Sequence, residues 1–175
     1  DAHLAHDDSP QAHLIREYAR DMTRHGARCF VRFVTVATRG ARAGSVQLAQ
    51  LVCLAHGRAM SVRSVSNPGG ESPAGEGAMM VADGRPETKW LDRRQAPLLL
   101  ELEGGMPDGY YLVTANDHKE RDPVRWRLEA SSDGTVWHVL DDRSHADQCV
   151  PAERKHASST FAIGDLGRQT ALHLY

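Results

Sequence analysis

The sequence predicts an all-β protein, an antiparallel β-sandwich preceded by one amphipathic helix. From Cys29 onward, short apolar runs show the two-residue period of strands and are bounded by Gly, Pro, Asn or Asp, with no helical pattern between them. Such a series favours a sandwich over a parallel α/β sheet. The 175 residues, of which 41% are hydrophobic, are enough for one domain with a buried core.

Residues 1–27 differ from the rest and are predicted to form a helical extension, with the sandwich domain at 28–175. Ser9 can cap a helix, Pro10 suits its first position and Gly26 ends it. We expect the apolar stripe of this helix to pack on the domain that follows or on another chain. The stripe consists of Leu14, Ile15, Tyr18, Ala19 and Met22.

The predicted strands follow one another along the chain. The alternation is clearest in 124–131, where Val124, Trp126 and Leu128 share one face while Arg125 and Arg127 share the other. Two glycines mark a turn at 39–44, and a long loop rich in Pro, Gly, Ser and Glu occupies 66–81. The predicted strands are 29–38, 45–55, 97–103, 109–117, 124–131, 135–142, 159–163 and 170–175.

Charge and hydropathy exclude two classes of partner. The formal net charge of -2 leaves no basic field to neutralise nucleic-acid phosphates or an anionic membrane surface. No apolar run approaches the roughly 20 residues that span a bilayer, which predicts that the chain has no transmembrane segment. Residues 1–8 have neither the basic nor the apolar region of a targeting peptide, so we expect that any such peptide has already been removed or was never part of this sequence.

Three short motifs make the chain recognisable: DGRPETKW at 83–90, TANDHKERDPVRW at 114–126 and SSDGTVW at 131–137. Together they make residues 28–165 resemble the discoidin-like family, also called coagulation-factor type C or galactose-binding-like domains. The resemblance implies a jelly-roll β-sandwich of about eight core strands, typically non-catalytic, with loops at one end that bind sugars, lipids or proteins in various relatives. Ala130 stands where the family usually has glycine, and the closing segment 170–175 is poor in aromatic residues.

The turn at 81–90, VADGRPETKW, has two interpretations. As scaffold, the Asp83 carboxylate accepts backbone N–H bonds beside Gly84, Pro86 stiffens the bend, Thr88 bonds another loop group and Trp90 enters the core. As a metal site, Asp83, Thr88 and loop carbonyls would supply oxygen ligands to a structural Ca²⁺, as in some relatives that this turn resembles. We favour the scaffold interpretation.

Two further clusters of chemically versatile residues are also interpreted as structural or solvated. In the segment 116–123, Asn116, Asp117, Arg121 and Asp122 form a polar group in which we expect the arginine to pair with its flanking carboxylates, with Pro123 setting the entry to the next strand. Near the start of the chain, a loose group of ligand-type residues matches no rigid metal site. That group is His3, His6, Asp7, Asp8 and His13.

The three cysteines, Cys29, Cys53 and Cys149, are too few for a disulfide framework and match no zinc spacing. We expect buried thiols, with a single bridge between Cys29 and Cys149 as the alternative.

The chain contains no G-x-S-x-G, P-loop or G-x-G-x-x-G motif. The sequence therefore predicts that the protein is not an enzyme. It also predicts no catalytic, cofactor-binding or metal-binding residues.

The aromatic residues decide between two kinds of binding module. Nearly all lie in predicted strands, and the loops 66–77, 118–123 and 143–159 contain none, although sugar sites usually stack a ring on the saccharide. A polar sugar site would use Glu71, His118 or Arg121, and we expect Met79 and Met80 in the core. We therefore predict a non-catalytic interaction module, an accessory or structural subunit docking on other protein subunits, with a carbohydrate-binding module as the alternative.

Overall fold

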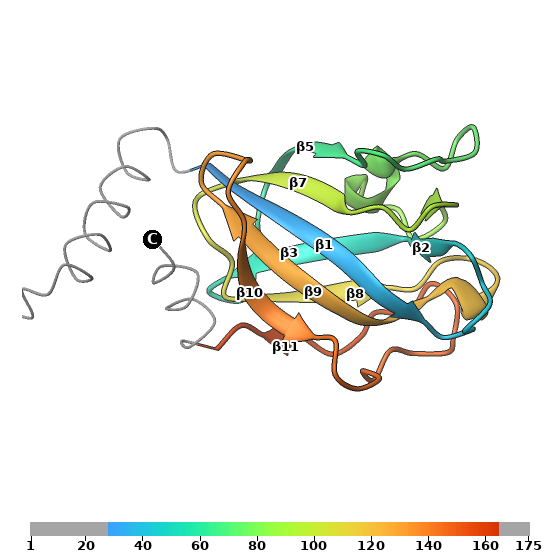
Figure 1. The fold of residues 1–175 in the computed structure, drawn as a ribbon. Helices are drawn as coiled ribbons and strands as arrows, with labels where there is room; N and C mark the ends of the chain where they lie inside the picture. Colours follow the sequence, from blue (N-terminus) through green and yellow to red (C-terminus); the bar gives the residue numbers. More distant parts are fainter. Residues whose placement is uncertain (1–27, 165–175) are drawn as a thin grey trace, which may run out of the picture.

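The computed structural model describes residues 28–164, shown in colour in Figure 1. The predicted helix at 1–27 and the predicted strand at 170–175 lie outside these residues. Within them, the chain forms antiparallel strands, and its two helices, η1 (Ala78–Ala82) and η2 (Lys119–Arg121), are short 3₁₀ turns. The predicted all-β class is therefore confirmed.

The strands of the described chain form two larger sheets and one small one. The five-stranded sheet has the order β10-β9-β1-β7-β5, the four-stranded sheet β11-β8-β3-β4, and β2 pairs with β6. The strands are β1 (Arg28–Thr38), β2 (Val46–Leu48), β3 (Gln50–Ala55), β4 (Arg58–Ala59), β5 (Val62–Ser66), β6 (Trp90–Asp92), β7 (Leu98–Glu103), β8 (Gly109–Val113), β9 (Pro123–Ser131), β10 (His138–Arg143) and β11 (Phe161–Ala162). None of the helices in residues 28–164 is long and apolar enough to cross a membrane.

The core lies between the two larger sheets, because alternate residues of their strands point inward. In β1, Cys29, Val31 and Phe33 are fully buried. The Trp126 ring of β9 stacks on Phe33 with centroids 5.5 Å apart and meets Phe161 of β11 edge to face at 5.1 Å. Contacts of this kind contribute about 0.5–1.5 kcal/mol beyond the burial of apolar area. The rings therefore join the two layers of the sandwich.

Several strand assignments differ from the sequence prediction. The predicted strand 45–55 is interrupted at Ala49, whose N–H donates to the Val113 carbonyl, and β2 and β3 belong to different sheets. The prediction also missed β4, β5 and β6. β5 is an edge strand with mostly exposed residues, and β4 and β6 have only two and three residues, so none of the three has enough alternation to be recognised.

All three cysteines are free thiols. Burial raises the pKa of both Cys29 and Cys53 to about 12. The prediction of buried thiols is thus confirmed for these two but is wrong for Cys149, which is exposed. The alternative bridge between Cys29 and Cys149 is also wrong, because Cys29 points into the core from β1 while Cys149 lies in the irregular segment after β10.

Several connecting segments meet at one end of the sandwich, which we call the loop end (Figure 1). They are the turn between β1 and β2, the segment between β5 and η1, and the segment between β8 and β9. β1 begins at the opposite end. The loop end therefore brings together side chains that are far apart in the sequence.

Candidate binding site at the loop end

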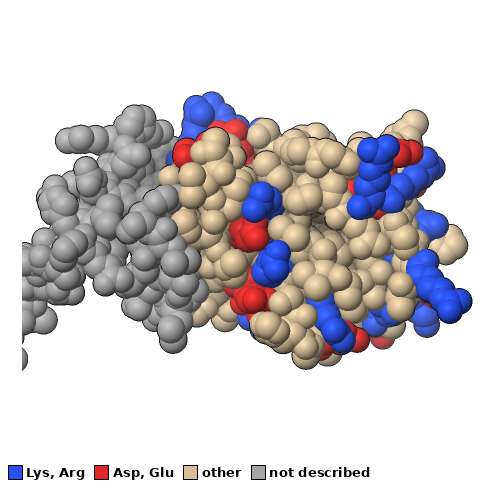
Figure 2. All heavy atoms as spheres, viewed as in Figure 1, with Lys and Arg blue, Asp and Glu red and all other residues tan. Residues whose placement is uncertain are grey.

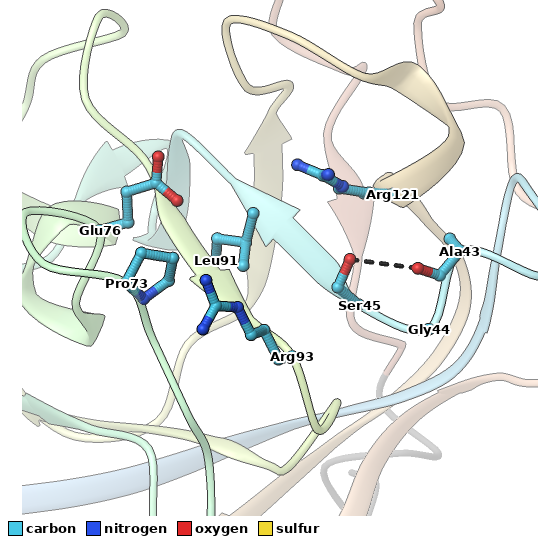
Figure 3. A pocket seen from close by; sticks show the side chains of 8 residues that line it. All are labelled: Ala43, Gly44, Ser45, Pro73, Glu76, Leu91, Arg93 and Arg121. Carbon is cyan, nitrogen blue, oxygen red and sulfur yellow. Dashed lines mark hydrogen bonds between the residues drawn. The ribbon is translucent and has the colours of Figure 1, made fainter.

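A pocket of about 360 Å³ opens at the loop end, and Figure 3 shows the side chains that line it. Its buried floor is Leu91 of β6, and its charged groups are Glu76, Arg93 and Arg121. In the view of Figure 3, Arg121 and Glu76 lie on opposite sides of the opening. We call it the loop-end pocket; its lining is Ala43, Gly44, Ser45, Pro73, Glu76, Leu91, Arg93 and Arg121.

One wall of this pocket is held by a buried carboxylate, that of Asp122, which is 0% exposed. Arg154 Nη1 donates to Asp122 Oδ1 at 2.8 Å, and its Nη2 donates to Oδ2. Arg39 Nη2 donates to the same Oδ2 at 3.3 Å. The predicted pairing of Arg121 with its flanking carboxylates is therefore wrong. The arginines that neutralise Asp122 come from two other segments, which the sandwich topology brings to this loop.

As a result, the Arg121 guanidinium is left without a partner in the described part of the chain. No other side chain or carbonyl within residues 28–164 forms an ion pair or hydrogen bond with its guanidinium. The residue ends η2, is half-buried and points toward the opening of the pocket (Figure 3). Its loop is fixed to the β1–β2 turn, because Gly40 N donates to the Glu120 carbonyl at 2.8 Å.

A second buried group, Lys89, links this loop to the strand β6. The Lys89 side chain is 5% exposed, and its Nζ lies 2.6 Å from Asp117 Oδ1 and 3.7 Å from Glu76 Oε1. Partial burial alone would raise the pKa of Asp117, but the hydrogen bond and charge of Lys89 outweigh it and hold that pKa below its ordinary value. Gln47 Nε2 also donates to the Asp117 carbonyl at 2.7 Å. Asp117 is thus a structural carboxylate.

The opposite wall is fixed by Asp92, which is fully buried at the end of β6. Its carboxylate accepts the backbone N–H groups of Glu71, Arg94 and Ala96 at 2.8, 2.9 and 2.7 Å. Leu91 N donates to the Glu76 carbonyl at 3.0 Å. These bonds tie the long loop to β6, so that Glu76 and Arg93 have defined places on the pocket wall.

The turn 81–90 shows the contacts expected of a structural turn. Arg85 N donates to Asp83 Oδ1 at 2.9 Å, and Thr88 Oγ1 donates to Asp83 Oδ2 at 2.6 Å. Trp90 is fully buried, and its Nε1 donates to Asn67 Oδ1 at 3.3 Å. In residues 28–164, no group of three or more His, Cys, Asp or Glu side chains has metal-binding geometry. Calcium binding at Asp83 and Thr88 stays a prediction.

The other residues considered for a polar site take different places. Glu71 lies near the pocket, 3.5 Å from Arg93 and 3.2 Å from Arg94, whereas His118 is exposed and does not line the pocket. Met79 is 55% exposed, so its predicted place in the core is wrong. The outward-facing position on a short 3₁₀ turn explains this difference. The histidines and aspartates at 3–13 lie outside the described residues.

Sequence reasoning missed Glu76 and Arg93 as pocket residues. Glu76 stands in a loop rich in Gly, Ser and Pro, and Arg93 follows the TKWLD segment, so no local pattern distinguishes them from solvated charges. No aromatic ring lines the pocket. Trp90, Tyr110 and Trp126 are fully buried.

Comparisons with known proteins found a partial similarity to a plant enzyme. No family model matches the chain, and no solved structure matches it. A peptide-N(4)-(N-acetyl-beta-glucosaminyl)asparagine amidase of Arabidopsis thaliana is 39% identical over 88 residues, which are 46% of this chain and 12% of the amidase. The similarity thus involves a small part of a much longer protein.

Proposed function

We propose that the protein is a non-catalytic interaction module with the discoidin-like jelly-roll fold, which docks as an accessory or structural subunit within a larger protein assembly. The observation that carries this proposal is an apolar surface formed by the turn between β9 and β10 together with exposed residues of the adjoining strands β1 and β10. Val136 and Val139 are 42% and 36% exposed, and Trp137 between them is half-buried. Phe30 lies against the same turn, its ring next to Gly134. We call Phe30, Val136, Trp137 and Val139 the sheet-face patch.

The charged residues beside the sheet-face patch are already paired. Arg32 Nε donates to Glu129 Oε2 at 2.6 Å, and the Arg32 guanidinium lies 4.5 Å from the Trp137 ring centroid. Figure 2 shows this face with a short line of alternating basic and acidic groups and largely uncharged surface on both sides. Paired charges lose less on desolvation than isolated charges, and exposed apolar groups favour contact with a partner. The face therefore suits a protein interface.

The predicted helical extension would supply a second apolar surface. Residues 1–27 precede β1 in the sequence. In the predicted amphipathic helix, the stripe from Leu14 to Met22 needs a partner. A subunit that docks on the sheet-face patch could also cover this stripe.

Purification of the tagged chain from its native source tests this proposal. We expect a companion protein in a stoichiometric complex on size-exclusion chromatography, which is lost in a Val136→Asp, Val139→Asp double variant. The matched control is Ser66→Asp, an exposed residue on edge strand β5 of the same sheet. A chain that elutes alone, or a companion that stays bound to the double variant, would contradict docking through this face.

A second candidate function is carbohydrate binding, in which the loop-end pocket would hold the sugar. The pocket volume of about 360 Å³ falls in the range of about 300–1,000 Å³ found for small-molecule sites. The similar plant protein is named as an amidase of N-acetyl-beta-glucosaminyl asparagine in peptides. A glycan array probed with and without Ca²⁺ tests this function. Sugar-specific binding that is abolished by a change in the pocket supports it, and an array without a reproducible binder contradicts it.

A further inference from the structure

The charged side chains of the loop-end pocket do not balance one another. Arg93 and Arg121 both line it, against the single carboxylate of Glu76. That carboxylate lies 3.7 Å from the buried Lys89 ammonium, which offsets much of its charge. Arg93 is 59% exposed and lies 3.5 Å from Glu71, while Arg121 has no ionic or hydrogen-bonding partner within residues 28–164. The pocket therefore carries a surplus positive charge that is centred on Arg121.

The geometry around Arg121 is suited to binding rather than to solvation alone. Its loop is anchored by Asp122, which two arginines neutralise, and by the backbone bond from Gly40 to Glu120. A Cβ at Gly40 would lie 2.8 Å from Glu120 Cβ, so the two segments are in close contact. Because these contacts fix the backbone of the loop, a ligand that binds Arg121 does not have to order the loop first.

The remaining lining defines the rest of the ligand. Leu91 and Pro73 offer apolar surface, and Glu76, on the side of the opening across from Arg121, can accept hydrogen bonds (Figure 3). A guanidinium pairs best with a planar carboxylate, through two parallel N–H···O bonds. The matching ligand therefore has a carboxylate at one edge, hydroxyl donors at the other and aliphatic C–H groups between them.

We propose that the loop-end pocket binds an acidic sugar of the hexuronic acid class, with its carboxylate on Arg121 and a hydroxyl group donating to Glu76. This inference rests on the second candidate function, carbohydrate binding, and names its ligand class. The Arg121 interaction supplies the discrimination against neutral sugars, because the guanidinium has no partner in the described chain that a ligand would have to displace.

Titration of the full chain with methyl β-glucuronide and methyl β-glucoside, followed by NMR chemical shifts, tests the proposal. The two probes differ only in the carboxylate at C6. We expect the acid to bind at least tenfold more tightly than the neutral sugar, and its affinity to fall at high salt because the Arg121 site is open to solvent. In Arg121→Gln the preference should disappear. The thermal midpoint should change little, since that side chain forms no ion pair or hydrogen bond within residues 28–164.

Arg58→Gln is the matched control, an exposed arginine on β4 that does not line the pocket, and it should keep the preference. Equal binding of both probes would overturn the acidic-sugar inference while leaving carbohydrate binding in place. Binding of neither probe would count against both proposals for this pocket. A preference for the acid that persists in Arg121→Gln would also overturn the assignment, because the carboxylate would then be bound elsewhere.

Discussion

The indole Nε1 of Trp126 donates a hydrogen bond of 2.7 Å to the hydroxyl oxygen of Tyr110. Trp126 belongs to β9 of the five-stranded sheet and Tyr110 to β8 of the four-stranded sheet, so this bond crosses the core. The Tyr110 hydroxyl in turn donates to Asp141 Oδ2 at 2.7 Å. Burial and the charge of Asp141 raise the pKa of Tyr110 above its ordinary value, which keeps the hydroxyl protonated as a donor.

Removing this hydroxyl should destabilise the sandwich. We expect Tyr110→Phe to lower the free energy of unfolding by about 1–3 kcal/mol, because it leaves the buried Trp126 N–H and an oxygen of Asp141 without this partner. Urea unfolding measures the change. Tyr111→Phe, at the next, half-buried position, is the control and should cost less than about 0.5 kcal/mol. Equal losses in the two variants would show that the cross-core bond contributes little.

The buried carboxylate at the loop end should matter more than a similar pair on the surface. Asp122→Ala leaves the guanidinium groups of Arg39 and Arg154 uncompensated, and we expect a loss of about 3 kcal/mol in the free energy of unfolding. The matched control is Asp147→Ala. Its carboxylate pairs with Arg125 at 2.6 Å but is 65% exposed, so the loss should be below about 1 kcal/mol. Similar losses would contradict a special role for Asp122.

The long loop should depend on one glycine. A Cβ at Gly70 would lie 1.8 Å from Asn67 Oδ1, the atom that accepts the hydrogen bond from Trp90. We therefore expect Gly70→Ala to shift the turn and to cost about 1–3 kcal/mol of stability in chemical denaturation. At Gly77 a Cβ meets nothing within 4 Å and the backbone has φ −73°, so Gly77→Ala should be neutral. Two neutral variants would contradict the predicted clash.

Acid should weaken the turn at 131–137 through Asp133. Its carboxylate accepts the N–H groups of Val136 and Thr135 at 3.0 and 2.7 Å, which holds the pKa of Asp133 well below its ordinary value. Because the folded-state pKa is lowered, this contribution is present above about pH 4 and is lost as the pH falls further. In Asp133→Asn the urea midpoint should therefore decline less steeply between pH 5 and pH 2. The difference from the wild type should correspond to the loss of about one titrating carboxylate. Ser132→Ala should keep the wild-type slope.

Thiol labelling should separate the three cysteines. In the native chain we expect one thiol to react quickly with an aromatic disulfide reagent, that of the exposed Cys149. Cys29 and Cys53 should react only after unfolding, because they are buried and a pKa of about 12 leaves almost no thiolate. Mass spectrometry of the labelled peptides identifies the sites. Labelling of no thiol in the native chain would instead indicate a bridged or covered Cys149.

The sequence by itself determined the local features of this protein. The alternation in 124–131 placed Trp126 and Leu128 in the core, and the segment 81–90 predicted a structural turn in which the Asp83 carboxylate accepts a backbone N–H bond. Both features depend on residues that are a few positions apart in the sequence, so the local backbone conformation determines their geometry. What the sequence could not determine, such as the division of 45–55 between two sheets, depends on the strands that lie beside it.

Only the tertiary structure decided which groups meet at the loop end. Asp122 is adjacent to Arg121 in sequence but binds Arg154 and Arg39, which are 32 and 83 positions away. The physical reason is that a buried carboxylate needs the cations that the folded chain brings within reach, and sheet pairing, not sequence distance, sets which ones these are. Within residues 28–164, the same pairing leaves Arg121 without a partner, beside a pocket whose other charged residues come from distant segments.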